Sequence, residues 1–369
     1  MALIVQKYGG SSLATPALIR SVAARIAQRS RSGDKIIVVV SATGKTTNAL
    51  ETKAYSVASD PDPREMDMLI SVGERESVSL MAMAINDIDP GLAVSFTGSQ
   101  IGLITDNNHG SARILEIKGD RLKQALDLGK IPVIAGFQGV STEKQITTLG
   151  RGGSDTTAVA VAAALKADVC EIYSNVKGVY TADPELCTEA VLIKELDYDS
   201  MLVISSMGAR VLKNEAVEYA KRLGVRIMTG SAFDGKMGTI ISDSVMNRDK
   251  IISIISNCSL CYRYFDKNQN IPDNIKKIRY FQSGPALSFA VLDRKAALKE
   301  ETDCYSVAIA GAGIKSEDAK IRQTLQILKD TNDVIAFDIS ELKIEFFLKY
   351  KCMQNVLILL HSLFFDGKS

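Results

Sequence analysis

Three loops in the N-terminal half of the chain carry residue types that bind anions. The first is Lys7-Tyr8-Gly9-Gly10-Ser11-Ser12, in which a cation at the end of an expected strand precedes two glycines and two hydroxyls. Adjacent glycines let backbone N–H groups converge on an anion, and Lys7 adds a full positive charge. The same run is also typical of an ordinary turn, so these residues alone leave both interpretations open.

The second loop is Gly150-Arg151-Gly152-Gly153-Ser154-Asp155-Thr156-Thr157, which leads into an Ala-rich helix. A helix N-terminus offers free N–H groups and a positive dipole end to an anion. Ser154 or Asp155 could equally be a simple N-cap. Arg151 favours the binding function, because a guanidinium pairs with a carboxylate or phosphate through two hydrogen bonds.

The third loop, Ser41-Ala42-Thr43-Gly44-Lys45-Thr46-Thr47, ends like a P-loop. That motif also needs a glycine five positions before Gly44, where this chain has Val39. The spacing therefore excludes a P-loop and leaves a different hydroxyl-rich loop.

Short apolar runs that alternate with amphipathic segments must position these loops. A helix is expected to start at Pro16 with Thr15 as its N-cap. This alternation predicts a largely parallel sheet with helices on both faces. The other predicted helices cover residues 66–85, 119–128, 156–166 and 208–223, and the strands cover 3–6, 35–40, 93–96, 131–135, 169–173, 225–229 and 239–241.

The pattern changes after Ser242. Residues 305–363 follow a β-α-β-β-α order, which is a ferredoxin-like unit without its last strand. Residues 250–256 form an apolar strand with no local partner, and we expect them to supply the missing strand. The stretch 257–304 offers only one helix near residues 274–278 and one strand over 286–292.

Composition excludes several classes of protein. The 369 residues carry a net charge of +1, which gives neither the basic footprint of a nucleic-acid-binding protein nor a polybasic membrane patch. No apolar run approaches the roughly 20 residues that span a bilayer. Cys258 and Cys261 lack further zinc ligands in a chain with two His, so we interpret the cysteines as thiols. We expect a cytoplasmic protein.

Taken together and in order, the motifs resemble those of the aspartate kinases in the amino-acid kinase family. The match spans residues 1–243, and residues 305–363 resemble that family's ACT regulatory domain. The motifs are residues 7–12, Val40-Ser41-Ala42, Gly73-Glu74-Arg75, Thr97-Gly98-x-Gln100, residues 150–155 and Val179-Tyr180-Thr181-Ala182-Asp183-Pro184.

The resemblance implies a three-layer α/β sandwich with a mainly parallel central sheet. This catalytic domain would cover residues 1–245. A smaller ferredoxin-like α+β ACT region would follow over 246–369, degenerate between 257 and 304, and would form a homodimer.

The implied reaction is ATP-dependent phosphorylation of the β-carboxylate of L-aspartate to 4-phospho-L-aspartate. This is the first step towards lysine, diaminopimelate, threonine and methionine. Mg²⁺ would enter with ATP and be held mainly by phosphates, because no carboxylate cage or other protein metal site is visible. Neither nucleic acid nor membrane is expected as a partner.

The resemblance also assigns residues to roles. Lys7 and Asp155 would be catalytic. The residues implied to hold aspartate are Ser41, Thr47, Glu74, Arg151, Gly152, Gly153 and Ser154. Those implied to bind ATP are Lys7, Gly9, Gly10, Ser11, Ser174, Asn175, Tyr180, Asp183 and Arg210.

Three departures from the family pattern fall near the implied nucleotide site. Asn175 replaces a usual Asp, Glu185 replaces a common Arg, and Lys213-Asn214 replaces a His-Pro pair. There are two alternatives to an aspartate kinase. One is a kinase for another carboxylate such as glutamate, and the other is a decayed kinase that only binds ligands or partners. Because 257–304 is too short for a second full ACT unit, we expect weak or absent feedback inhibition by lysine or threonine.

Overall fold

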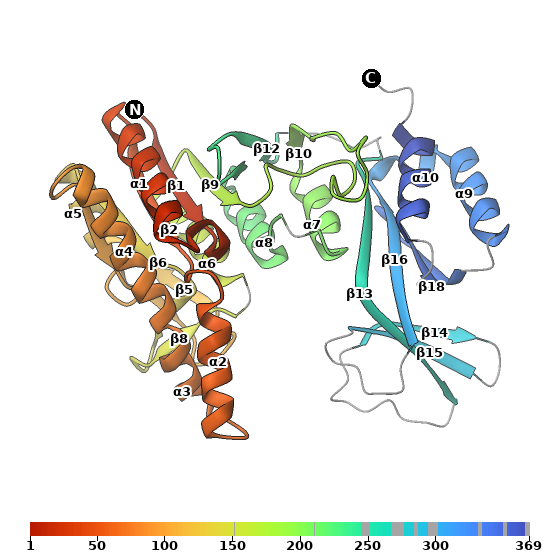
Figure 1. Ribbon diagram of the computed structural model, residues 1–369, viewed down its shortest axis with the longest axis horizontal. Coiled ribbons are helices and arrows are strands. Elements are labelled where there is room, and N and C mark those ends of the chain that lie inside the picture. Colours follow the sequence, from red (N-terminus) through yellow and green to blue (C-terminus); the bar gives the residue numbers. More distant parts are fainter. Residues whose placement is uncertain are drawn as a thin grey trace. The chain divides into compact units, whose positions relative to one another are not determined.

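The chain forms two compact units (Figure 1). The first comprises Met1–Val179, Ile193–Tyr198 and Val211–Val245, and the second comprises Tyr180–Leu192, Asp199–Arg210 and Met246–Ser369. The computed structural model describes residues 1–150, 152–209, 211–244, 251–266, 277–283, 287–293, 302–330, 334–349 and 353–365.

An eight-stranded sheet forms the centre of the first unit. All neighbouring strands run parallel except β11 and β12, which confirms the predicted mainly parallel sheet. The order across the sheet is β10 (Glu195–Leu196), β12 (Met237–Ile241), β11 (Ile227–Ser231), β9 (Val169–Ser174), β1 (Leu3–Tyr8), β2 (Lys35–Val40), β6 (Ile131–Ala135) and β3 (Ala93–Phe96).

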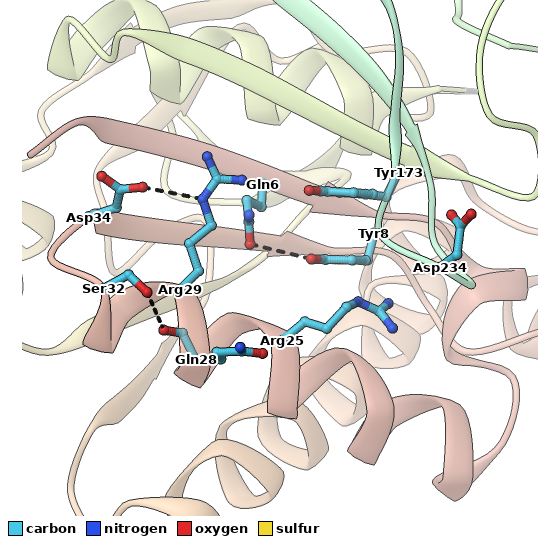
Figure 2. Close-up of a pocket in the computed structure, with 10 residues that line it drawn as sticks. Gln6, Tyr8, Arg25, Gln28, Arg29, Ser32, Asp34, Tyr173 and Asp234 are labelled. Carbon is cyan, nitrogen blue, oxygen red and sulfur yellow. Dashed lines mark hydrogen bonds and ion pairs between the residues drawn. The ribbon is translucent and has the colours of Figure 1, made fainter.

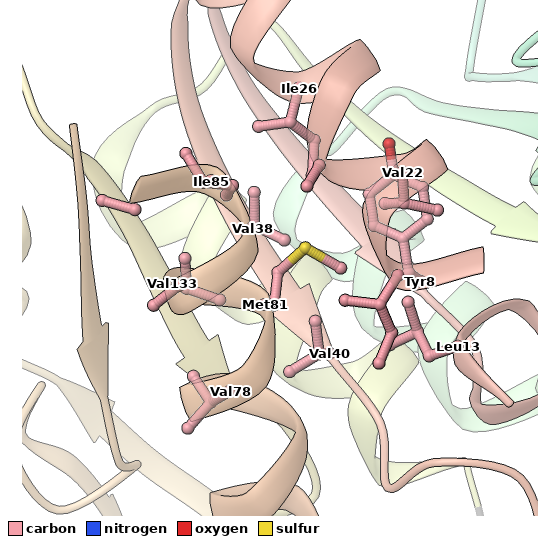
Figure 3. Packing of buried hydrophobic residues seen from close by; sticks show 14 of the residues in the cluster. Tyr8, Leu13, Val22, Ile26, Val38, Val40, Val78, Met81, Ile85 and Val133 are labelled. Carbon is pink, nitrogen blue, oxygen red and sulfur yellow. The ribbon is translucent and has the colours of Figure 1, made fainter. Parts of the chain in front are cut away.

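Helices cover both faces of this sheet and make three layers. On one face, α1 (Pro16–Arg31) and α4 (Val72–Ile88) bury their apolar sides against Val38 and Val40 of β2 (Figure 3). The other face of β1 contacts α6 (Gly153–Leu165), which packs against α8 (Asn214–Leu223). Successive side chains of a strand point to opposite faces of the sheet. Tyr8 is therefore buried in the core beneath α1 and α4, whereas Lys7 points towards α6.

Local signals explain where several helices begin. Thr15 Oγ1 accepts a hydrogen bond from Leu18 N, and Pro16 occupies the first position of α1, as the sequence predicts. The single helix predicted over 66–85 is instead two helices, α3 (Pro63–Ile70) and α4, separated at Ser71. The helix predicted from Gly208 begins only at Asn214, and α2 (Thr46–Val57) and α5 (Asp120–Asp127) complete this unit.

The first unit also contains a second, smaller sheet, which the sequence did not predict. Its strands have only three or four residues, too few to show an alternating pattern in the sequence. In order across the sheet they are β5 (Ile114–Ile117), β4 (Leu103–Thr105), β7 (Gln138–Ser141) and β8 (Ile146–Thr148).

The second unit contains one antiparallel sheet. Its order is β14 (Lys277–Ser283), β15 (Leu287–Asp293), β13 (Ser253–Asp266), β16 (Thr302–Ala310), β18 (Lys343–Lys349) and β17 (Val334–Ile339), with α9 (Asp318–Asp330) and α10 (Met353–Phe365). Residues 253–257 pair with 306–310, which confirms that this segment supplies the missing ferredoxin-like strand. In the part of the chain that the structure describes, no helix could span a membrane.

The structure of the degenerate stretch 257–304 agrees only in part with the prediction. Its predicted strand over 286–292 is found as β15. The predicted helix near 274–278 is wrong at its described end, because Lys277 and Ile278 belong to β14, and residues 274–276 lie outside the described residues. Pairing with β15 accounts for the extended conformation of this segment.

A segment of the implied catalytic region belongs to the second unit's core. Ala182 and Cys187 are buried in one cluster with Ile254 and Tyr305. Thr181 Oγ1 also lies 2.9 Å from Nε2 of the buried His361 on α10. The 180–192 segment is therefore held by the same core as the ferredoxin-like sheet. The helix α7 (Tyr198–Ser206) follows it in the chain and was not predicted.

Candidate active site

Lys7 and Asp155 form a close ion pair at the end of β1. Lys7 Nζ lies 2.6 Å from Asp155 Oδ1, and both side chains are largely buried, 12% and 9% exposed. Asp155 lies in the first turn of α6, where the helix dipole favours a negative charge. The structure thus brings together the two residues that the resemblance names as catalytic.

Close backbone packing shapes the glycine loop after β1. A Cβ on Gly10 would lie only 2.4 Å from the carbonyl oxygen of Ala42, so only glycine fits there. Gly44 N donates to Gly10 O at 2.9 Å, and Ser41 N donates to Tyr8 O at 3.1 Å. The first and third loops found in the sequence are therefore neighbours in space. They form one rim of the site.

Glu74 is a buried carboxylate, and one of its two oxygens has no hydrogen-bond partner. The residue is 3% exposed. Its Oε1 accepts a hydrogen bond from Ala42 N at 3.2 Å, whereas Oε2 is buried without a hydrogen-bond partner. Burial raises the pKa of Glu74 to about 7. A positively charged ligand beside such a group would favour its ionised form, which burial disfavours.

The turn that leads into α6 places Ser154 beside the carboxyl end of β6. Gly150 and Gly152 have φ of +73° and +84°, the left-handed region that glycine adopts easily. Ser154 is buried, and a Cβ on Gly136 would lie 2.8 Å from its Cβ, so the end of β6 packs directly on this residue. Of the predicted residues, Gly152 is therefore the N-cap of α6, and Gly153 and Ser154 lie in its first turn, beside the carboxyl end of β6.

Phe137 belongs to this region although sequence reasoning missed it. Its φ is +68°, a strained value for a residue with a bulky side chain, and strain of this kind clusters at functional sites. Phe137 N donates to Thr157 Oγ1 at 3.1 Å. The only signal in the sequence is its place after Gly136 at the end of a strand.

Ser11 and Asn175, two of the residues implied to bind ATP, contact each other. Ser11 Oγ donates to Asn175 Oδ1 at 2.7 Å and joins the loop after β1 to the loop after β9. Ser174 accepts a hydrogen bond from Val176 N and shapes the second of these loops. Asn175 supplies the acceptor oxygen that a carboxylate would supply, so this contact tolerates the departure from the family pattern.

The other predicted residues are more scattered. Thr47 lies in the first turn of α2 and is half-buried. Tyr180 and Asp183 lie in the second unit, where Asp183 Oδ1 accepts from Glu185 N at 2.9 Å and Asp183 is exposed. Arg151 and Arg210 lie outside the described residues.

A polar pocket lies on the opposite face of β1 and β9 from Lys7 (Figure 2). The rings of Tyr8 and Tyr173 stack there at 4.8 Å, and burial raises the pKa of both phenols. The buried Glu171 carboxylate accepts from Gln6 Nε2 at 2.8 Å and pairs with Arg29 at 2.9 Å. All of these polar groups have partners within the protein, so the pocket supports the strands that carry the site.

Comparison with known proteins shows the family of this chain. Residues 2–229 match the amino acid kinase family, which is well over half of the chain. The chain belongs to the amino acid kinase family. Members similar to it include the aspartokinase of Mycolicibacterium smegmatis, 52% identical over 246 residues, and that of Corynebacterium glutamicum, 50% identical over the same length. Each match covers 66% of this chain, which spans 58% of the length of each relative.

Solved structures of the same family share the fold. The aspartate kinase from Synechocystis is 31% identical, with a TM-score of 0.61 over 98% of this chain and 69% of that chain. E. coli aspartokinase III in complex with aspartate and ADP is 20% identical, with a TM-score of 0.79 over 99% of this chain and all of that one. At this identity, the likeness to E. coli aspartokinase III shows the fold alone.

The described residues contain no group of three or more His, Cys, Asp and Glu side chains placed to hold a metal ion. Five cysteines in these ranges are free, and Cys258 is exposed while Cys261 is buried.

Proposed function

We propose that this chain is an aspartate kinase that transfers the γ-phosphoryl group of ATP to the β-carboxylate of L-aspartate. The observation that carries the proposal is the buried Glu74 carboxylate. Its Oε2 has no partner, although the loop after β2 fixes its Oε1. The ammonium group of an amino-acid substrate is the partner this oxygen lacks. The aspartokinase relatives at about half identity support the same reaction.

The reaction forms a bond between a β-carboxylate oxygen and the γ-phosphorus. It breaks the bond between that phosphorus and the β–γ bridging oxygen of ATP, which leaves as part of ADP. Catalysis of such a transfer consists mainly of positioning and charge stabilisation. Lys7 supplies the positive charge for the transferring group, and Asp155 holds the Lys7 ammonium in place at 2.6 Å. Glu74, Ser41, Thr47, Arg151 and the Gly152–Ser154 turn hold the aspartate.

For the nucleotide, we assign the loop of Gly9, Gly10 and Ser11 together with Ser174 and Asn175. A Cβ on Gly9 would lie 3.5 Å from Lys7 Nζ, an ordinary van der Waals distance, so the glycine loop lies directly beside the ammonium group. The resemblance adds Tyr180, Asp183 and Arg210. The donor set suits Mg²⁺ that arrives on the phosphates of ATP, because the carboxylates of Asp155 and Glu74 already serve Lys7 and the proposed substrate ammonium. Bound Mg²⁺ would neutralise phosphate charge.

The proposal extends to the setting of the enzyme. We place the reaction product at the start of lysine, diaminopimelate, threonine and methionine biosynthesis, in the cytoplasm. A homodimer would form through residues 246–369, where the sheet ends in the edge strands β14 and β17 and an edge strand can pair with another chain. Light scattering at the monomer mass would contradict the dimer.

A hydroxamate assay of acyl phosphate formation tests the activity. The full chain with Mg²⁺-ATP should form product with aspartate and little with glutamate. Product with glutamate alone would indicate the related carboxylate kinase, and no product with either would indicate a decayed kinase. Lys7→Ala serves as the inactive variant. Lys35→Ala is its matched control, because Lys35 begins the neighbouring strand β2 and pairs with Leu3, at the opposite end of β1 from Lys7.

A further inference from the structure

Asp67 is a buried carboxylate outside the proposed catalytic machinery, and it joins three separate segments. It lies on α3 with no exposed surface. His109 Nδ1 lies 2.8 Å from Oδ2, and Gly110 N donates to both oxygens at 3.1 Å. Thr148 Oγ1 donates to Oδ1. These partners come from the loop between β4 and β5 and from the last residue of β8.

These contacts extend directly to the turn that begins α6. Ala112 N donates to Thr148 O at 2.9 Å, so the loop and the end of β8 are hydrogen-bonded to each other as well as to Asp67. A Cβ on Gly150 would lie 3.2 Å from the carbonyl oxygen of Gly110. The Gly110 residue thus contacts Asp67 through its N–H and faces Gly150 through its carbonyl. Gly150 in turn accepts a hydrogen bond from Gly153 N at 3.0 Å.

The helix that carries Asp67 also leads to Glu74. α3 ends at Ile70, and α4 begins at Val72 with Glu74 in its first turn. Gln138 Nε2 donates to the carbonyl of Ser71 at 2.9 Å, which fixes the junction of the two helices. Asp67 is therefore linked on one side to the Glu74 helix and on the other to the Gly150–Ser154 turn.

We infer that Asp67 is a positioning residue that holds the two halves of the aspartate site in register, namely Glu74 on one side and Gly150 with the start of α6 at Gly152–Ser154 on the other. This inference rests on the proposed function. A buried carboxylate must have its hydrogen bonds satisfied, so its donors take fixed positions. Small displacements of substrate-positioning groups have large kinetic effects. Aspartate binding is then sensitive to Asp67 although no atom of Asp67 contacts aspartate.

Thr148→Val tests the inference with little change in volume, because it removes the hydroxyl donor and leaves Asp67 in place. The KM for aspartate should rise about tenfold, while the KM for ATP changes less than about twofold. Thr148→Ser keeps the hydroxyl and should restore the KM for aspartate. A merely structural role would not produce this split between the substrates.

Thr147→Val is the matched control. Thr147 is equally buried on the adjacent position of β8, and its hydroxyl contacts Thr105 at 2.6 Å rather than Asp67. Its KM for aspartate should stay near the wild-type value. Equal effects of the two valine variants, or a Thr148→Val enzyme with only a lower melting temperature, would overturn the positioning role alone. A wild-type chain that forms no aspartyl hydroxamate would overturn the proposed function, and this inference with it.

Discussion

The ammonium of Lys7 and the carboxylate of Asp155 meet at 2.6 Å, one from the end of a strand and the other from the first turn of a helix. Asp155 thereby fixes a flexible lysine side chain at one point above the glycine loop. A positive charge held before the reaction stabilises the transition state without reorganisation.

Lys7→Ala should lower kcat at least about 10²-fold, which corresponds to about 2.7 kcal/mol, because the Lys7 charge acts on the transferring phosphoryl group. Steady-state kinetics with the hydroxamate readout measures this effect. Lys35→Ala should keep the wild-type kcat. An unchanged kcat in Lys7→Ala would remove Lys7 from the site.

The raised pKa of Glu74 predicts a pH dependence of aspartate use. Only the ionised carboxylate pairs with an ammonium group, and burial raises the pKa of Glu74 to about 7. kcat/KM for aspartate reports the free enzyme, so it should rise with pH through about 7 and level off above it. Glu74→Gln should lower kcat/KM and remove this rise. A profile in Glu74→Gln that matches the wild type would assign the pH dependence to another group.

The same pKa has the opposite consequence for the stability of the unliganded protein. Between the ordinary glutamate pKa and about 7, the folded state holds a proton on Glu74 that the unfolded state has lost. The contribution of Glu74 to stability is therefore fully present at low pH and is lost as the pH rises through about 7. Thermal unfolding without ligands should show Glu74→Gln gaining stability relative to wild type as the pH increases across this range.

Much of the fold was predictable because its signals are local. The apolar strand 35–40 and the N-cap at Thr15 are readable from neighbouring residues alone. The partner strand for residues 305–363 was predictable from an unpaired apolar run, since a ferredoxin-like sheet lacks one strand without it. The short strands of the second sheet and the break at Ser71 carry no comparable pattern.

The candidate site was predictable only in part, since its decisive features are tertiary. Motif positions place Lys7, Glu74 and Asp155 in one site by resemblance. The free oxygen of Glu74 depends on a hydrogen bond from Ala42, and Asp67 depends on loops far away in the sequence. Phe137 is conspicuous only through its backbone conformation.

Gly152 should be sensitive to substitution for two separable reasons. An alanine there would have φ of +84°, and its Cβ would lie 2.4 Å from Cγ and 2.7 Å from Cβ of Lys213. Gly224 has φ of +67° and no atom within 4 Å of its position for a Cβ, so Gly224→Ala isolates the backbone cost, roughly 1–2 kcal/mol. Gly152→Ala should cost more in chemical denaturation and lower activity at least about tenfold. Equal costs for the two variants would show that Lys213 moves aside freely.

The Arg29–Glu171 pair should contribute more than the surface pairs of the same helix. Arg29→Met leaves the buried Glu171 carboxylate with neutral partners only and also removes the partly exposed pair with Asp34, so it should destabilise the chain by about 1.5–3 kcal/mol. Adding Glu171→Gln should recover most of this loss, because no charge then remains buried. Arg31→Met removes an exposed pair with Asp89 and should cost less than about 1 kcal/mol. Urea denaturation measures all three, and equal losses for Arg29→Met and Arg31→Met would contradict the argument.

The second unit predicts weak or absent feedback inhibition. Regulation through ACT units, in the resembling enzymes, uses an amino-acid pocket between two complete units. Here the described residues between 257 and 304 extend β13 and add β14 and β15 to the same sheet as β16, β18 and β17. In these ranges the stretch adds strands to one unit and shows no helix of a second, from which we predict that the usual pocket does not form.

Lysine or threonine at millimolar concentration should therefore leave the hydroxamate rate within about twofold, since coupling between sites needs a ligand that distinguishes two states. ADP, the product, provides the positive control, because it should inhibit in the same assay by competing with ATP. A tenfold fall in rate with either amino acid would show that a regulatory pocket exists despite the altered strand arrangement.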